Sequence, residues 1–278
     1  MFSFPVNITN NKEVFCKELT NGHYKNILKY LQNNDDVNLA KYFEQIISEL
    51  VKEKNLNYID KLIILLYARS VSINANLEIS SNNTKNTVQV KFLADKILEG
   101  YHPFERTIYQ EENDIEVTIG YPLTITESDD ILSKIHRIKI GEVQTDIESL
   151  TDLERDNLFS LLPSSLSKFI VNELEKEPTP FTKLFSYQSG TERKELLYTF
   201  DAKENFELLK LCFSDNLNNF YYYEYISLTK LRMSLSDFLD RCTPNEIQLH
   251  IKNIIKENEH NKPKSKTDMP RPGLGVPG

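Results

Sequence analysis

The sequence predicts an α+β protein with an N-terminal helical module containing a small antiparallel sheet, then a mostly helical C-terminal module and an extended tail. Apolar residues recur at helical spacing in the first and last thirds of the chain and alternate with polar residues in the middle third. These two periods are typical of helices and half-buried strands, respectively. The chain has 278 residues, and we place its modules at 1–145 and 146–261, before a Gly/Pro/Lys-rich tail at 262–278 that is either flexible or a docking segment.

The first third opens with two short strands, split by the turn residues Asn10 and Asn11, and continues with three helices. Asn57 is placed to cap the third of these helices. That helix is apolar on almost every side, which predicts that it lies in the core of the N-terminal module. The expected ranges are 2–8 and 14–19 for the strands and 23–32, 37–54 and 58–71 for the helices.

The middle third predicts a small antiparallel sheet with one face in contact with water, because apolar and polar residues alternate along its segments. Ser128, Asp129 and Asp130 form a plausible helix start. The expected strands are 77–79 paired with 88–92, 106–110 paired with 115–119, and 137–143, and the expected short helices are 92–101 and 131–135.

The last third is predicted to be mainly helical, with one hairpin around Gly190. Its strongest local signal is a capping box formed by Thr243 and Glu246, with Pro244 at the first helical position, which predicts a helix that continues to about residue 258. The other expected elements are helices at 151–162, 164–176, 202–213, 216–232 and 234–241 and strands at 184–187 and 195–200.

Composition excludes several classes of protein. The 33 basic and 41 acidic residues give a net charge of −8, which argues against nucleic-acid binding because phosphate contacts need clustered Lys and Arg. The three cysteines are widely spaced, which predicts reduced thiols in a cytoplasmic setting. The N-terminus lacks the features of a secretory signal, and the longest apolar run, 62–66, is far shorter than the roughly 20 residues of a membrane span. We therefore expect no secretion and no membrane partner.

No motif identifies a reaction. The five histidines lack zinc-site spacing and are expected to be surface or capping residues. Acidic pairs at 35–36, 111–112 and 129–130 lie in polar segments typical of turns and helix caps. The serine-nucleophile elbow, the P-loop and the dinucleotide-binding glycine motif are all missing. We therefore expect no catalytic residue, no metal and no cofactor. An enzyme whose site forms only in the folded chain is kept as an alternative.

The most unusual local feature is an aromatic run at 220–225. On a helix these rings point in several directions, so they cannot all be buried against one neighbour. Two interpretations stay open: an aromatic core helix, or a protein interface, where Tyr and Phe are enriched. A platform for bases or sugars fits poorly with the negative charge. The candidate interface residues are Tyr221, Tyr222, Tyr223 and Tyr225.

The tail at 262–278 is too rich in Pro, Gly and Lys to bury much surface. It is either a frayed terminus or a segment that docks on a partner. For the second case the candidate contact residues are Pro270, Pro272, Leu274 and Val276.

Three segments suggest a family. They are HYKNILKY at 23–30, YIDKLIILLYARSVSI at 58–73 and NDIEVTIGYPL at 113–123. Their order, and the patterns Y-K-x-[IL]-L-[KR] and D-[KR]-x-x-x-[IL]-L-x-x-R-x-x-S-[IL], resemble the baseplate hub assembly proteins of T-even-type contractile-tailed phages. The resemblance covers about residues 10–125 and is sharpest at Asp60, Arg69 and Ser72.

The resemblance implies a non-enzymatic structural or assembly role in the tail baseplate, in contact with other tail proteins, and a location in the virion or in the host cytoplasm during assembly. Asp60 and Arg69 would then be structural or interface residues, and Arg69 joins the candidate interface set. Nine residues apart on one helix, they lie roughly 180° from each other and cannot pair directly. A cytoplasmic adaptor or regulatory protein unrelated to phages is the other alternative, beside the enzyme.

Overall fold

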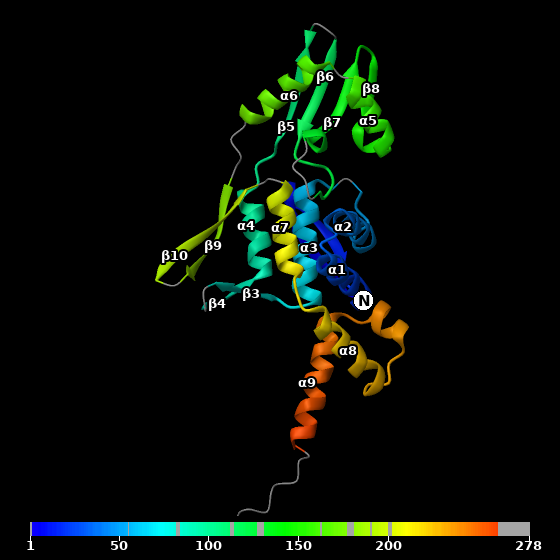
Figure 1. The fold of residues 1–278 in the computed structure, drawn as a ribbon, viewed down its shortest axis with the longest axis vertical. Helices are drawn as coiled ribbons and strands as arrows, with labels where there is room; N and C mark the ends of the chain where they lie inside the picture. The colour runs from blue at the N-terminus through cyan, green and yellow to red at the C-terminus, as the bar shows by residue number, and fades with distance from the viewer. Residues whose placement is uncertain are drawn as a thin grey trace, which may run out of the picture.

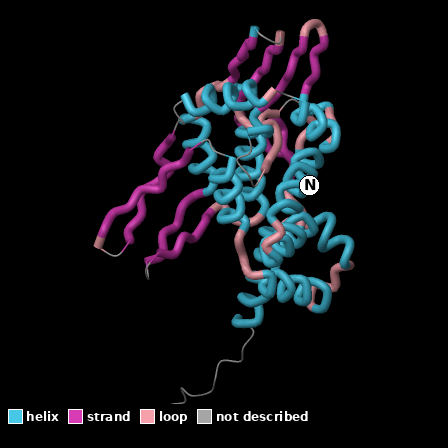
Figure 2. Tube along the Cα trace, turned by 45° about the horizontal axis from the view of Figure 1, so that its top comes forward, coloured by secondary structure: helices cyan, strands magenta, loops and turns pink. Residues whose placement is uncertain are grey.

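The computed structural model has a helical body with a four-stranded sheet at one end and helices α8 and α9 at the other (Figure 1). Two β-hairpins extend side by side from the body (Figure 2). This is an α+β architecture, as the sequence predicts. The structure describes residues 2–54, 56–81, 84–111, 114–126, 131–161, 163–176, 181–189, 191–199 and 202–260.

The chain begins with an antiparallel hairpin of β1 (Ser3–Ile8) and β2 (Lys12–Lys17), close to the predicted strands. Asn10 and Asn11 both adopt positive φ in the turn, a conformation that Asn tolerates better than most residues. Val6 pairs with Val14, and both side chains are buried against the helical body. The hairpin therefore covers one side of the core.

Helix α3 (Tyr58–Ser72) is the centre of the body, and 12 of its 15 residues are buried. It is surrounded by α1 (Asn21–Asn33), α2 (Asp36–Leu50), α4 (Val90–Gly100) and α7 (Ala202–Phe213). Asn57 caps α3 as predicted, because its side chain accepts from the Asp60 amide while the Asp60 carboxylate accepts from the Asn57 amide. The predicted core position of this helix is confirmed.

The two lateral hairpins are β3 (Asn76–Ser81) with β4 (Thr84–Gln89), and β9 (Phe181–Ser189) with β10 (Glu192–Thr199). Both hairpins were expected, but the predicted strand at 88–92 is wrong at its end, because α4 begins at Val90. Val88, Val90 and Phe92 alternate as in a strand, whereas Val90, Leu93 and Ile97 have helical spacing. Burial of the second set on one face decides for the helix.

The four-stranded sheet has the order β5 (Glu105–Gln110), β6 (Ile115–Gly120), β7 (Ile135–Ile140) and β8 (Val143–Asp146), with every neighbouring pair antiparallel. Its inner face packs against α6 (Ser164–Lys176), and α5 (Asp152–Leu161) lies nearby. On the outer face Arg137 Nε donates to Asp146 Oδ1 at 2.8 Å in an exposed ion pair. The predicted antiparallel sheet with one wet face is confirmed for β5 to β8, but the strands expected at 77–79 and 88–92 belong to the separate hairpin of β3 and β4.

The predicted single strand at 137–143 is wrong, because β7 and β8 form a hairpin within it. Gly141 adopts a φ of 59° in the turn, which lets the chain reverse between Ile140 and Val143. Between β6 and β7, the expected helix at 131–135 is a 3-10 turn, Ile131–Lys134, and its predicted start at 128–130 lies outside the described residues.

Buried apolar residues form two clusters. The larger unites residues 6–125 with residues 206–251, and the smaller joins the inner face of the sheet to α6. Both clusters contain residues from either side of the proposed boundary at 145/146. The module limits stay a prediction, and the described packing joins the two ends of the chain in one core.

The C-terminal part contains α8 (Leu217–Thr229), a π-helical turn η5 (Asp237–Arg241) and α9 (Pro244–His260). The predicted capping box of α9 is confirmed, since the Thr243 amide donates to Glu246 Oε2 at 2.8 Å and the Glu246 amide donates to Thr243 Oγ1 at 3.2 Å. The helix expected at 234–241 is mostly the wider π-turn of η5.

Gly120 is the glycine of the sheet that leaves least room for a side chain. A Cβ at this position would lie 2.5 Å from His136 Cε1 and 2.8 Å from the Phe104 carbonyl oxygen. We expect Gly120→Ala to lower the free energy of unfolding by about 1–3 kcal/mol through overpacking, measured by urea denaturation. Gly141→Asn is the control, because Asn tolerates a positive φ and the space there is open. Equal stability of the two variants would contradict this prediction.

Candidate interaction surface

Helix α8 is anchored by one aromatic residue of the run. Phe220 is buried, with its ring centroid 6.2 Å from that of Tyr24 on α1 and 5.7 Å from that of Phe238 in η5, both edge-on. Asn216 caps the helix by accepting from the Asn218 amide at 2.9 Å. Because Phe220 points into the core, helix geometry sets the direction in which each of the other aromatic side chains of α8 points.

The single acidic residue of α8, Glu224, is neutralised inside the molecule. Lys25 of α1 donates to both of its carboxylate oxygens, at 2.8 and 3.0 Å, and the two side chains are only 17% and 13% exposed. The Lys25 ammonium also lies 5.4 Å from the ring centroid of Tyr221. The positive charge of Lys25 therefore balances the negative charge of Glu224, and the pair adds no net charge to the surface of α8.

The outward side of α8 is an uncharged face, which we call the tyrosine face. It carries Tyr221, Tyr222 and Tyr225, which are 42%, 56% and 60% exposed, and the exposed residues Asn218 and Thr229. Charge depletion with aromatic enrichment is the compositional signature of the core of a protein interface. In a chain with 27% charged residues, such a face is unusual.

Tyr223 differs from the other tyrosines of the run, because it is partly buried and packs against the main hydrophobic cluster. The expectation that the rings point in several directions is confirmed: Phe220 and Tyr223 turn inward, and Tyr221, Tyr222 and Tyr225 turn outward. We therefore leave Tyr223 out of the tyrosine face.

The orientation of α8 is fixed by a junction between the N-terminus of α1 and η5. The Asn21 amide donates to the Cys242 carbonyl at 2.9 Å, and Asn21 Nδ2 donates to the Phe238 carbonyl at 3.0 Å. Gly22 allows this approach, since a Cβ there would lie 3.1 Å from the Leu239 carbonyl oxygen. Sequence reasoning missed this junction, and the only signal for it is the Asn-Gly pair at a helix start.

A second contact joins α1 to the start of α8. The Tyr24 hydroxyl donates to Asp215 Oδ2 at 3.0 Å, and burial together with this carboxylate raises the pKa of Tyr24. Tyr24 therefore stays protonated and keeps donating at any ordinary pH.

Arg69 lies far from the surface, with 6% of the residue exposed. Its Nε donates to the Cys212 carbonyl at 2.8 Å, and its Nη1 donates to the carbonyls of Asn74 and Asn76. Asp60, at the other end of α3, accepts from the Thr9 amide. Both residues serve packing within the chain, so we leave Arg69 out of the tyrosine face. The tail residues Pro270, Pro272, Leu274 and Val276 lie outside the described residues.

A separate hollow of about 440 Å³ lies beside α2. Apolar residues, lysines and glutamates line it, among them Lys17, Glu44, Ile47, Glu49, Val51 and Lys61. Several of these charged groups are already bound within the chain, as Lys61 is to Glu44 at 2.9 Å. Among the residues that the structure describes, no three His, Cys, Asp or Glu side chains are grouped so as to hold a metal ion.

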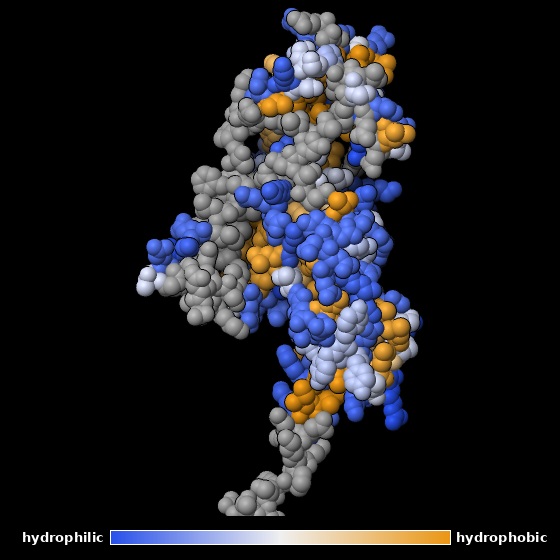
Figure 3. Space-filling model, in the orientation of Figure 1, coloured by the Kyte–Doolittle hydropathy of each residue, from blue (hydrophilic) through white to orange (hydrophobic). Residues whose placement is uncertain are grey.

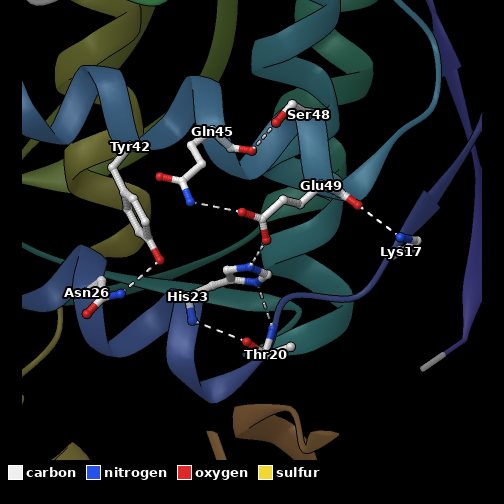
Figure 4. Close-up of polar contacts among 8 residues, drawn as sticks. All are labelled: Lys17, Thr20, His23, Asn26, Tyr42, Gln45, Ser48 and Glu49. Atoms are coloured by element: carbon white, nitrogen blue, oxygen red, sulfur yellow. Dashed lines mark hydrogen bonds and ion pairs between the residues drawn. The ribbon is translucent and has the colours of Figure 1, made fainter. Parts of the chain in front are cut away.

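Figure 4 shows the polar network beside this hollow. His23 Nδ1 accepts from the Thr20 amide at 3.2 Å, and its Nε2 lies 3.0 Å from Glu49 Oε2. The hydrogen bond from His23 lowers the pKa of Glu49. Lys17 donates to the Glu49 carbonyl, so the network ties β2, α1 and α2 together. His23 is a capping residue, as expected of the histidines, and its partners are structural.

In Figure 3 the surface over α1 and α2 is mostly hydrophilic, and hydrophobic residues appear both at the sheet end and at the end where Figure 1 places α8 and α9. Within the described part of the chain, no helix is both long and apolar enough to cross a membrane.

The fold and this surface define a class, that of α+β proteins with an uncharged aromatic face on one helix. The particular family follows from comparison: a family model described as T4 bacteriophage base plate protein matches residues 1–207. The chain belongs to this family of T4-type phage baseplate proteins. It matches no curated protein and no solved structure. The resemblance to phage baseplate proteins is thereby confirmed at the level of the family.

Proposed function

We propose that the chain is a non-enzymatic structural or assembly component of the baseplate, in its hub region, and that it binds other tail proteins through the tyrosine face. The observation that carries this proposal is the internal neutralisation of Glu224 by Lys25, which leaves three tyrosines on a surface free of charge. Family membership supports a place in the phage tail, and the hub assignment rests on the resemblance over residues 10–125.

The tyrosine face is suited to binding for energetic reasons. The opposite side of the helix is buried, so the backbone under the rings is already ordered. Each tyrosine has only two rotatable side-chain bonds, so its side chain loses less freedom on binding than a long flexible one would. Tyrosine is enriched among the residues that dominate binding energy, because it combines a large apolar area with a hydroxyl that can form a hydrogen bond. The face lies beyond residue 207, outside the part of the chain that the family model matches.

The experiment replaces two tyrosines that face solvent. We expect Tyr222→Ser with Tyr225→Ser to weaken capture of baseplate proteins at least tenfold, because each exposed anchor in an interface contributes of the order of 1–2 kcal/mol. The measurement is affinity purification of the tagged full-length chain from infected cells, read by quantitative mass spectrometry.

Tyr109→Ser is the matched control, since Tyr109 is as exposed as these residues but lies on β5 at the opposite end of the molecule. Thermal unfolding verifies that all variants keep the fold. The proposal fails if the double variant captures the same tail proteins, in the same amounts, as the Tyr109 variant. Recovery of no tail protein by the unchanged chain would also reject it.

A further inference from the structure

We propose that the hollow beside α2 binds a short acidic segment of another baseplate protein, in which an aliphatic side chain lies between aspartate or glutamate residues. The hollow lies within the residues that the family model matches, whereas the tyrosine face lies beyond them. It is therefore a second interaction site, and it does not depend on the role proposed for the tyrosine face.

The charge of the hollow is opposite in sign to that of the whole chain. Its described lining includes four lysines and three glutamates, in a chain with a net charge of −8. The lysines are Lys17, Lys52, Lys54 and Lys61, and the glutamates are Glu44, Glu49 and Glu53. Lys12, outside the lining, pairs with Glu53 at 3.1 Å and adds a further positive charge beside the hollow.

The other two carboxylates of the lining are also engaged within the chain. Glu44 pairs with Lys61 at 2.9 Å. The Glu49 carboxylate accepts from Gln45 at 3.0 Å and lies 3.0 Å from His23 Nε2, as Figure 4 shows. Each acidic group of the lining therefore has a partner before any ligand binds.

Three lysines of the lining have no carboxylate partner among the residues that the structure describes. Lys52 and Lys54 are exposed, and within the described ranges neither forms an ion pair. Lys17 donates to the Glu49 main-chain carbonyl at 3.1 Å. This carbonyl belongs to the C-terminal end of α2, whose partial negative charge of about half a unit is smaller than the charge of the three ammonium groups. The remaining positive charge favours an anionic ligand.

The hollow also offers an apolar contact, which favours a protein segment over a small anion. Ile47, Val51 and Leu56 contribute to the lining and are nearly fully buried, whereas Lys52 and Lys54 are exposed. The volume of about 440 Å³ lies at the lower end of the roughly 300–1,000 Å³ typical of ligand sites. Exposed ion pairs add little affinity. The aliphatic side chain therefore supplies most of the binding, and the lysines select an acidic sequence.

The test titrates the full chain, isotope-labelled in its methyl groups, with a short peptide of alternating leucine and glutamate and follows the NMR signals. We expect the methyl signals of Ile47, Val51 and Leu56 to shift, with a dissociation constant below about 1 mM. The signals of Val117 and Ile138, buried under the sheet, should not move. A leucine–glutamine peptide and a serine–glutamate peptide should each bind about fivefold more weakly, because each lacks one of the two contacts.

Reversing two charges of the hollow tests the role of the lysines. Lys52→Glu with Lys54→Glu should weaken binding of the leucine–glutamate peptide about tenfold, because attraction becomes repulsion. Lys252→Glu with Lys256→Glu is the matched control, since it makes the same change in net charge on exposed positions of α9, outside the hollow. Thermal unfolding verifies that both variants keep the fold.

Several outcomes would overturn the inference. One is the absence of methyl shifts at a several-millimolar peptide concentration, and another is equal affinity of the two charge-reversed variants. Equal shifts with inorganic phosphate alone would identify a small anion as the occupant instead. Signals that change on dilution of the chain without peptide would identify a second copy of the chain.

Failure of this inference can be distinguished from failure of the proposed function. Tyr222→Ser with Tyr225→Ser should leave the affinity for the peptide unchanged, because neither tyrosine lines the hollow. A loss of peptide affinity in that variant would place the peptide on the tyrosine face and overturn the inference. Capture of baseplate proteins that does not depend on these tyrosines rejects the proposed function, whatever the peptide titration shows.

Discussion

Replacing Arg69 with methionine is expected to lower the free energy of unfolding by about 3–5 kcal/mol, the range seen when a buried charged group is removed from its partners. The guanidinium donates to three carbonyls, those of Cys212, Asn74 and Asn76, which come from two separate parts of the chain. Methionine fills a similar volume but donates nothing, so the buried Cys212 carbonyl loses its partner. Burial lowers the pKa of Arg69, yet the group stays protonated because that pKa starts so high.

The measurement is equilibrium unfolding in urea. Arg137→Met is the matched control, because Arg137 forms its ion pair with Asp146 on the exposed outer face of the sheet, where such pairs contribute about 0–1 kcal/mol. Arg69→Lys should fall between the two, since one ammonium cannot reach all three carbonyls in the planar arrangement that Arg provides. If Arg69→Met were no less stable than Arg137→Met, the role assigned to the three hydrogen bonds would be wrong.

The second large effect is expected at Lys61, where methionine should reduce stability by about 2–4 kcal/mol. Lys61 is almost fully buried and donates to Glu44 Oε2 at 2.9 Å and to the Leu123 carbonyl at 2.7 Å. The other oxygen of Glu44 accepts from the Ile125 amide at 2.6 Å. Together the pair holds the segment that leaves the sheet after β6 against α2 and α3.

A double-mutant cycle separates the pair from its surroundings. Glu44→Gln keeps an acceptor for the Ile125 amide while it removes the charge, and the combined variant removes both charges. We expect a coupling free energy of about 1–3 kcal/mol between the two sites, again from urea unfolding. Additive effects would show that Lys61 and Glu44 act independently. Lys12→Met serves as the control, because Lys12 pairs with Glu53 on the exposed surface.

The sequence was sufficient for elements whose determinants are local. The caps of α3 and α9 were predicted because a capping box places both partners within four residues. The central position of α3 followed from its apolar character on every side. The hairpin at Gly141 did leave a signal in the sequence. Ile138 and Ile140 alternate, but the next apolar residue, Val143, is out of step, and a glycine lies between them.

The parts that escaped prediction depend on distant main-chain groups. Arg69 and the Cys212 carbonyl are 143 residues apart, and a carbonyl leaves no trace in the amino-acid sequence. The sequence does predict that some rings of the aromatic run point inward and others outward, because neighbouring side chains on a helix point in different directions. Which of Tyr221 and Tyr223 turns outward is set by the positions of α1 and η5, which only the folded chain provides.

The contacts of Asn21, Gly22 and Arg69 have a consequence for which substitutions the chain tolerates. These three positions, within the family-matched residues, supply specific side chains or the lack of one. Positions 212, 238, 239 and 242, beyond the match, meet them with carbonyl oxygens, which every amino acid carries. We therefore expect substitutions at these four positions to cost little through the hydrogen bonds, whereas substitutions at positions 21, 22 and 69 remove or obstruct the contacts themselves.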